Sequence, residues 1–188
     1  MYQFDYESFK SRLKEAAKQI FLKHAEQNRE EICGFSLYSD ESAMIILTSV
    51  NTYTYLHKQI KEEPLYEYDY RFSPEEWKYV AEESGEIDDL CKLLSNMHFE
   101  VAFAEYNEHR DIVFNIAVEA LVELKQEKLF AGLKNDFVLM FSVSDFDDTE
   151  LLLSCFERLN SKKLTEQYEE WLDEMDDDDF DDDFDDEF

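Results

Sequence analysis

The chain has 188 residues, of which 44% are hydrophobic and 15% aromatic, enough for one domain to bury a continuous core without disulfides or metal. Its 47 acidic and 18 basic residues give a formal net charge of −29 at pH 7. This charge argues against direct binding of nucleic acid or anionic lipid and favours a cationic partner.

Neither a leader sequence nor a membrane span is indicated. No basic segment followed by an apolar run opens the chain, and nowhere do eighteen apolar residues stand together, so we expect a cytoplasmic protein. Cys33, Cys91 and Cys155 form no CxxC pair and are odd in number, which predicts unpaired cysteines that serve as small core residues.

The chain opens with a helical pattern and continues with a strand pattern. Apolar residues recur at helical spacing from Phe9 to His24, and Asp5 can cap the first turn, which predicts an amphipathic helix. Alternating residues at 33–37 and a β-rich run at 44–50 flank a turn-like segment. This arrangement predicts a β-hairpin.

Two short elements are expected next. Residues 51–60 have the pattern of a short helix. Residues 67–71 are predicted as a strand, on which Tyr66, Tyr68 and Tyr70 alternate and so share one face.

A helix start is predicted at Ser73. Ser73 can cap the helix, Pro74 suits the first helical position, and Glu76 can complete a capping box. Phe72 and Trp77 have the spacing of a hydrophobic staple. These features together favour a regular helix after residue 73.

The second half of the chain is expected to be mostly helical. Residues 87–97 and 113–124 show helical patterns, whereas 99–103 fits either a strand or a helix. Residues 137–143 are nearly all apolar, which predicts a strand covered on both faces and central in the sheet. A helix follows at 151–159.

The folded part is expected to end near residue 175, because an apolar helical face runs from Leu164 to Met175. The predicted organisation is a single α+β domain at 1–175, with a small mixed or antiparallel β-sheet packed by several α-helices, and a disordered acidic tail at 176–188.

The tail reads DDDDFDDDFDDEF and holds ten acidic residues and no basic one, which leaves a charge of −19 for the rest of the chain. Self-repulsion prevents such a block from folding alone. Phe180, Phe184 and Phe188 recur every four residues, so on a basic surface they could line one face of a helix.

The sharpest catalytic pattern is Asp145 to Thr149, which imitates the DxDxT segment of haloacid-dehalogenase-type phosphatases. The chain after Thr149 holds only helices and the tail, so it lacks the later strands that such an enzyme uses for its remaining groups. We therefore interpret this segment as a solvated turn in which Asp147 or Asp148 caps the next helix.

No other pattern indicates an enzyme, a cofactor or a metal. The chain has no GxSxG motif and no Gly-rich phosphate loop. Its histidines lack the spacing of metal ligands, and the Glu-x-x-Glu-His segment at 105–109 is interpreted as solvated surface. The histidines are His24, His57, His98 and His109.

Four segments resemble a bacterial family, the domain of unknown function numbered 4303, over about residues 5–160. They are EEICGFSLYSD (30–40), SVNTYTYL (49–56), YRFSPEEWKY (70–79) and FSVSDFDDTELLLSCFERLN (141–160). The resemblance implies a small α+β protein with no established catalytic residues and, loosely, a role in toxin immunity. The acidic tail lies outside it.

Two groups of residues are candidates for contact with a partner. Trp77 lies near Tyr66, Tyr68, Tyr70 and Tyr79 in the chain, and this aromatic group either anchors a partner or belongs to the core. The chain end resembles the acidic tips of bacterial single-stranded-DNA-binding proteins at Asp185, Asp186 and Phe188, although Glu187 replaces their usual proline.

Together these observations favour an acidic, non-catalytic binding protein of the immunity or inhibitor type, whose partner is a basic protein such as a toxin. One alternative is an adaptor whose tail docks on a replication or repair protein, and another is a domain with a merely solubilising tail. The expected contact residues are Phe180, Phe184, Asp185, Asp186, Phe188 and Trp77.

Overall fold

The computed structural model describes residues 4–82, 84–100, 106–144 and 146–178, except for the side chains of 98–100 and 176–178. Within these ranges, three strands form one mixed sheet, ordered β2-β1-β3. β1 (Ile32–Asp40) pairs antiparallel with β2 (Ile46–Thr52) and parallel with β3 (Val138–Ser144). The predicted hairpin and the α+β class are confirmed.

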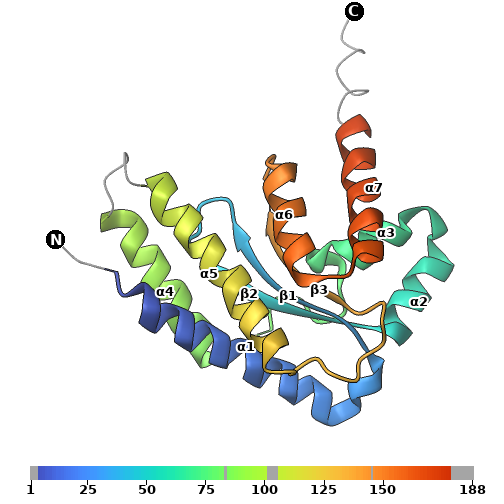
Figure 1. Cartoon of the computed structure of the whole chain (residues 1–188), viewed down its shortest axis with the longest axis horizontal. Coiled ribbons are helices and arrows are strands. Elements are labelled where there is room, and N and C mark those ends of the chain that lie inside the picture. The colour runs from blue at the N-terminus through green and yellow to red at the C-terminus, as the bar shows by residue number, and fades with distance from the viewer. Residues whose placement is uncertain (1–3, 83, 101–105, 145, 179–188) are drawn as a thin grey trace, which may run out of the picture.

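Helices cover both faces of this sheet (Figure 1). One face carries α1 (Tyr6–Asn28), α4 (Gly85–Glu100) and α5 (Tyr106–Gln126), and the opposite face carries α6 (Thr149–Leu159) and α7 (Lys162–Asp178). The helices predicted in these five regions therefore form, although α5 begins at Tyr106, before the predicted start at residue 113. The last helix extends to Asp178, three residues into the segment assigned to the tail, and residues 101–103 lie outside the described part.

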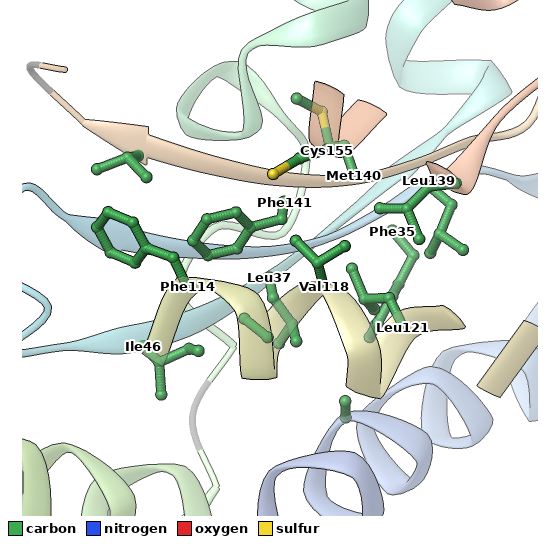
Figure 2. Packing of buried hydrophobic residues seen from close by; sticks show 14 of the residues in the cluster. Phe35, Leu37, Ile46, Phe114, Val118, Leu121, Leu139, Met140, Phe141 and Cys155 are labelled. Atoms are coloured by element: carbon green, nitrogen blue, oxygen red, sulfur yellow. The ribbon is translucent and has the colours of Figure 1, made fainter. Parts of the chain in front are cut away.

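Successive side chains along each strand point to opposite faces of the sheet, so each strand packs against both helical layers. Phe35 and Leu37 point towards α5, where Phe114 packs against Phe141 of β3 with ring centroids 5.3 Å apart (Figure 2). On the other face, Cys155 of α6 lies over the sheet (Figure 2). Because both faces are covered, the strands have near-continuous buried runs.

The capping predictions at two helices are confirmed. The carboxylate of Asp5 accepts a hydrogen bond from the backbone N–H of Ser8 at 3.0 Å, and that of Asp148 accepts one from Leu151 at 2.9 Å. Each carboxylate satisfies a donor that the first turn of a helix leaves free.

The cysteines are free thiols, as predicted. Cys33 and Cys155 are buried, whereas Cys91 is only half-buried. Burial raises the pKa of the Cys33 thiol to about 12. Cys33 is therefore protonated at neutral pH and acts as a core residue.

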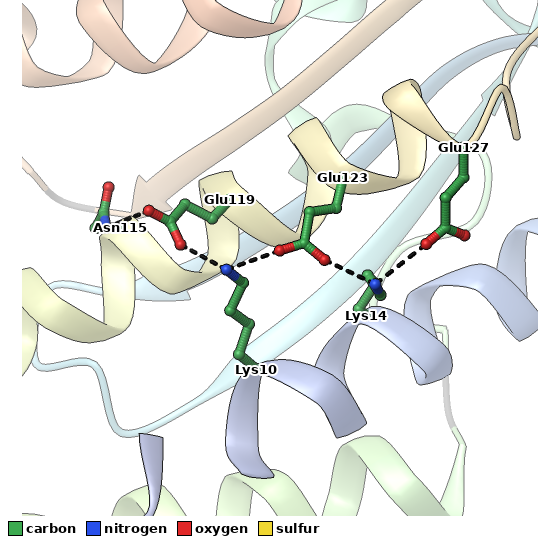
Figure 3. A network of polar contacts seen from close by, with 6 residues as sticks. All are labelled: Lys10, Lys14, Asn115, Glu119, Glu123 and Glu127. Atoms are coloured by element: carbon green, nitrogen blue, oxygen red, sulfur yellow. Dashed lines mark hydrogen bonds and ion pairs between the residues drawn. The ribbon is translucent and has the colours of Figure 1, made fainter. Parts of the chain in front are cut away.

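An ion-pair ladder joins α1 to α5 (Figure 3). Glu123 accepts from the ammonium groups of Lys10 and Lys14 at 2.8 and 2.7 Å. Glu119 and Glu127 extend the ladder at either end, at 2.7 Å from Lys10 and 3.1 Å from Lys14. The regular contacts arise because both sets of residues are spaced four apart, which places them on one face of each helix.

The prediction that the apolar strand is central was wrong, because β3 lies at the edge and β1 is central. A run of apolar residues reports that both faces of a strand are covered, and not how many strands pair with it. Part of the open edge is closed by a side chain. Asn160 accepts from the N–H of Leu139 at 3.1 Å and donates to its carbonyl at 2.7 Å.

The prediction of a strand at 67–71 was also wrong, because this segment forms the short helix α3 (Glu67–Phe72). It follows α2 (Tyr53–Glu62) and the 3-10 turn η2 (Pro64–Tyr66). Tertiary packing decides this case: the ring of Phe72 packs against Phe156 of α6 and Tyr168 of α7, with ring centroids 5.8 and 5.4 Å apart. The tyrosines therefore do not share a strand face.

The helix predicted at Ser73 is only the 3-10 turn η3 (Pro74–Glu76), and the side chain of Ser73 makes no capping bond. The chain leaves this turn in extended conformation at Trp77, and Tyr79 forms an isolated antiparallel bridge with Val50. The next regular helix is α4, the one predicted at 87–97, which begins at Gly85 and where the hydroxyl of Ser84 accepts from the N–H of Ile87 at 3.1 Å. The pairing of Tyr79 with β2 thus outweighs the local preference of Ser73 and Pro74 for a helix start.

Candidate partner-binding surface

The turn between α2 and α3 presents two apolar side chains to solvent. Leu65 is 94% exposed and Tyr66 is 56% exposed, the two highest values among the large hydrophobic residues described. Pro64 begins the 3-10 turn η2, and the N–H of Glu63 bonds to the carbonyl of Gln59 at 2.8 Å, closing α2. These local bonds place Leu65 and Tyr66 outside the core.

A hollow of about 410 Å³ lies beside these residues, and we call it the acidic hollow. Among the residues that the structure describes, three carboxylates line it and no basic residue does. Its lining consists of Glu63, Tyr66, Asp69, Tyr70, Ser73 and Glu76. Because η2, α3 and η3 each contribute to it, the hollow depends on the helical form of residues 67–72.

Aromatic donors, rather than cations, hold two of these carboxylates. The hydroxyl of Tyr70 donates to Glu63, and this bond raises the pKa of Tyr70 to about 12. The indole Nε1–H of Trp171 donates to Asp69 at 3.0 Å. Neutral donors orient a carboxylate without cancelling its charge, so the hollow keeps a negative potential.

A larger groove of about 970 Å³ lies on the other side of η3, and we call it the carboxyl-end groove. It occupies the end of β3 between η3, α6 and α7 and shares Ser73 with the acidic hollow. Trp171 links the two sites, because its ring lines the groove while its N–H bonds to Asp69 of the hollow.

Trp77 belongs to the core, the second of the two alternatives considered for its aromatic group. Its side chain is 2% exposed and packs on Gly34, where an added Cβ would lie 2.9 Å from the indole. A partner could reach this ring only if that packing opened. The other expected contact residues, Phe180, Phe184, Asp185, Asp186 and Phe188, lie outside the described residues.

The phosphatase-like segment is divided between structural roles. Asp148 caps α6 and Asp147 lines the carboxyl-end groove, whereas Asp145 lies outside the described residues. Among the residues that the structure places, no group of three or more His, Cys, Asp or Glu side chains could hold a metal ion.

Two of the four histidines are buried and hydrogen-bonded. His24 Nε2 lies 3.0 Å from a carboxylate oxygen of Glu82, and His109 Nδ1 lies 2.7 Å from the hydroxyl of Tyr6. The first contact joins α1 to the segment after η3, and the second joins α1 to α5. Both histidines therefore have a structural role.

Sequence reasoning missed Leu65 and the acidic hollow. The available signal was a leucine and a tyrosine isolated among acidic residues directly after Pro64, a pattern with no helical or strand period. The carboxylates of the hollow are spread over fourteen positions, from Glu63 to Glu76, so only the fold brings them together.

Within the described ranges, no helix is long and apolar enough to cross a membrane. A family model described as "Domain of unknown function (DUF4303)" matches residues 12–161. The comparison with curated proteins gave no match, and neither did the comparison with solved structures.

Proposed function

Because the chain belongs to the DUF4303 family, a family of unknown function, we propose a role from its own surface: an acidic, non-catalytic protein that binds a basic protein partner. The expected type is an immunity or inhibitor protein acting in the cytoplasm, and its partner is of the toxin class. The acidic tail assists capture by long-range attraction.

The exposed pair Leu65 and Tyr66 beside the acidic hollow carries this proposal. Single exposed apolar residues are ordinary on protein surfaces. Here, however, the pair adjoins oriented carboxylates, and apolar or aromatic anchors with charged surroundings are typical of interface centres. A basic partner would cover the two side chains while its cations face Glu63, Asp69 and Glu76.

The charge distribution also favours a protein partner over a nucleic acid. The whole chain carries −29, and the hollow gathers three of its acidic residues, with no basic one among the described residues of the lining. Such a surface repels phosphate and accelerates encounter with a cationic protein.

Co-purification from the source organism tests the proposal with three forms of the full chain. Wild type should recover a basic protein, and rising salt should release it because exposed charges are screened. The double variant Leu65→Ser/Tyr66→Ser should lose that protein. Val80→Ser, which removes another exposed apolar side chain, should retain it.

Recovery of the same protein by the double variant, or retention that does not change in high salt, would contradict the proposal. Deletion of Phe188 alone distinguishes the adaptor alternative from binding by the acidic domain. A tail that enters an apolar pocket loses its partner when this residue is removed, whereas bulk attraction by the acidic domain hardly changes.

A further inference from the structure

The carboxyl-end groove contains a buried hydroxyl with no partner. Ser142 of β3 is 8% exposed, and its Oγ has no hydrogen bond to any of the described residues. Ser142 lines the groove. A buried hydroxyl without a partner costs free energy, so a ligand that supplies a donor at this point would be stabilised.

Carboxylates and aromatic rings form the rest of the groove. Glu75 of η3 and Asp147 before α6 supply negative charge, and none of the described residues in the lining is basic. Four aromatic residues line the groove: Phe146 is half-buried and Trp171 is 8% exposed, whereas Phe72 and Tyr168 are fully buried behind them. This combination favours a flat cation over an anion or a purely apolar group.

One of these rings already contacts a guanidinium group. The Cζ atom of Arg110 lies 5.7 Å from the centroid of the Phe146 ring, within the range of a cation–π contact. Phe146 can therefore take a guanidinium on one side while it borders the groove.

We propose that the carboxyl-end groove receives an arginine side chain of the basic protein partner. This inference rests on the proposed function and names the group that the partner inserts. A guanidinium is planar, stacks on aromatic rings, and carries five donors that can serve Glu75, Asp147 and the Ser142 hydroxyl together. A lysine ammonium is more strongly hydrated and cannot stack in this way.

The two tryptophans allow a direct test on the ¹⁵N-labelled full chain. L-argininamide should shift the indole N–H signal of Trp171, which lines the groove, and leave that of Trp77, which is buried on Gly34. The shift should saturate, with an affinity about tenfold above that for L-lysinamide, because only the guanidinium stacks on the rings.

Matched variants locate the site. Asp147→Asn and Ser142→Ala should each weaken argininamide binding several-fold. Asp88→Asn makes the same charge change on the exposed surface of α4 and should leave the affinity unchanged. Glu63→Gln, in the acidic hollow, should also leave it unchanged.

Equal affinities for the two amides would overturn the proposal, and so would equal losses in Asp147→Asn and Asp88→Asn, because both results indicate bulk charge attraction. This failure is distinguishable from failure of the proposed function. The amide titration uses no protein partner, whereas the co-purification depends on Leu65 and Tyr66 of η2.

Discussion

The side-chain amide of Asn160 hydrogen-bonds both backbone groups of Leu139 and so takes the place that a neighbouring strand would have at the edge of β3. It also donates to the carbonyl of Phe156 at 3.0 Å, which joins the end of α6 to the sheet. One side chain thus pairs two backbone groups at an edge that would otherwise leave them unpaired.

Removal of this amide should destabilise the fold. We expect Asn160→Ala to lower the free energy of unfolding by about 1–3 kcal/mol, because the N–H and carbonyl of Leu139, a buried residue, lose their partner. Urea denaturation checks this value. Gln126→Ala removes an exposed amide at the end of α5 and should change stability by less than about 0.5 kcal/mol; a loss as large as that of Asn160→Ala would contradict the assignment.

The close contact between Gly34 and Trp77 predicts a second stability effect. A Cβ at residue 34 would lie 2.9–3.1 Å from three indole carbons, so Gly34→Ala requires the ring or the strand to move. We expect a loss of about 1–3 kcal/mol. Gly85→Ala is the control, because a Cβ there meets nothing within 4 Å; thermal unfolding should place it at or above wild type.

The ladder between α1 and α5 should make stability depend on pH. Hydrogen bonds from Lys10 and Lys14 lower the pKa of Glu123 below the ordinary 4.5. The stabilisation is therefore present above pH 4.5 and is lost as the pH falls through the lowered pKa. Hydrogen bonds to Glu119 and Glu123 raise the pKa of Lys10 above its ordinary 10.5. The stabilisation is therefore present below pH 10.5 and is lost as the pH rises through the raised pKa.

Glu123→Gln should consequently lower the unfolding free energy at pH 7 and low salt by at most about 1 kcal/mol. The difference from wild type should shrink as the pH falls from 4.5 towards 3, because the wild-type carboxyl takes up its proton as the pH passes the lowered pKa. Glu157→Gln, an exposed change on α6, is the control. A deficit that persists undiminished at pH 3 would show that packing, and not charge, is affected.

Asp147 and Asp148 of the phosphatase-like segment differ in their role, because only Asp148 caps α6. Asp148→Ala should destabilise the chain by about 1 kcal/mol, because the first turn loses its acceptor. Asp147→Ala should have a much smaller effect on unfolding, since its side chain lines the groove. Equal losses measured in chemical denaturation would refute this division of roles.

Local patterns were sufficient for much of the fold. The helical spacing from Phe9 to His24, the cap at Asp5 and the hairpin all appear as predicted, because each depends on residues close together in the chain. The covered state of β3 was also predicted correctly, since an apolar run reports burial of both strand faces.

The errors occur where distant contacts outweigh local preference. Ser73 and Pro74 favour a helix start, but Trp77 packs on Gly34 and Tyr79 pairs with Val50, so the chain leaves η3 extended. The alternation of tyrosines at 66–70 likewise fitted a strand as well as a helical turn, and the packing of Phe72 against Phe156 and Tyr168 selected the helix.

The sequence by itself determined the acidic charge, the α+β class and the family resemblance, because composition and local period are properties of the chain alone. Only the tertiary structure decided that β1 is central, that Trp77 is buried, and that Leu65 stands exposed beside an acidic hollow. These features depend on side chains far apart in the sequence, whose distances are set by how the helices and strands pack.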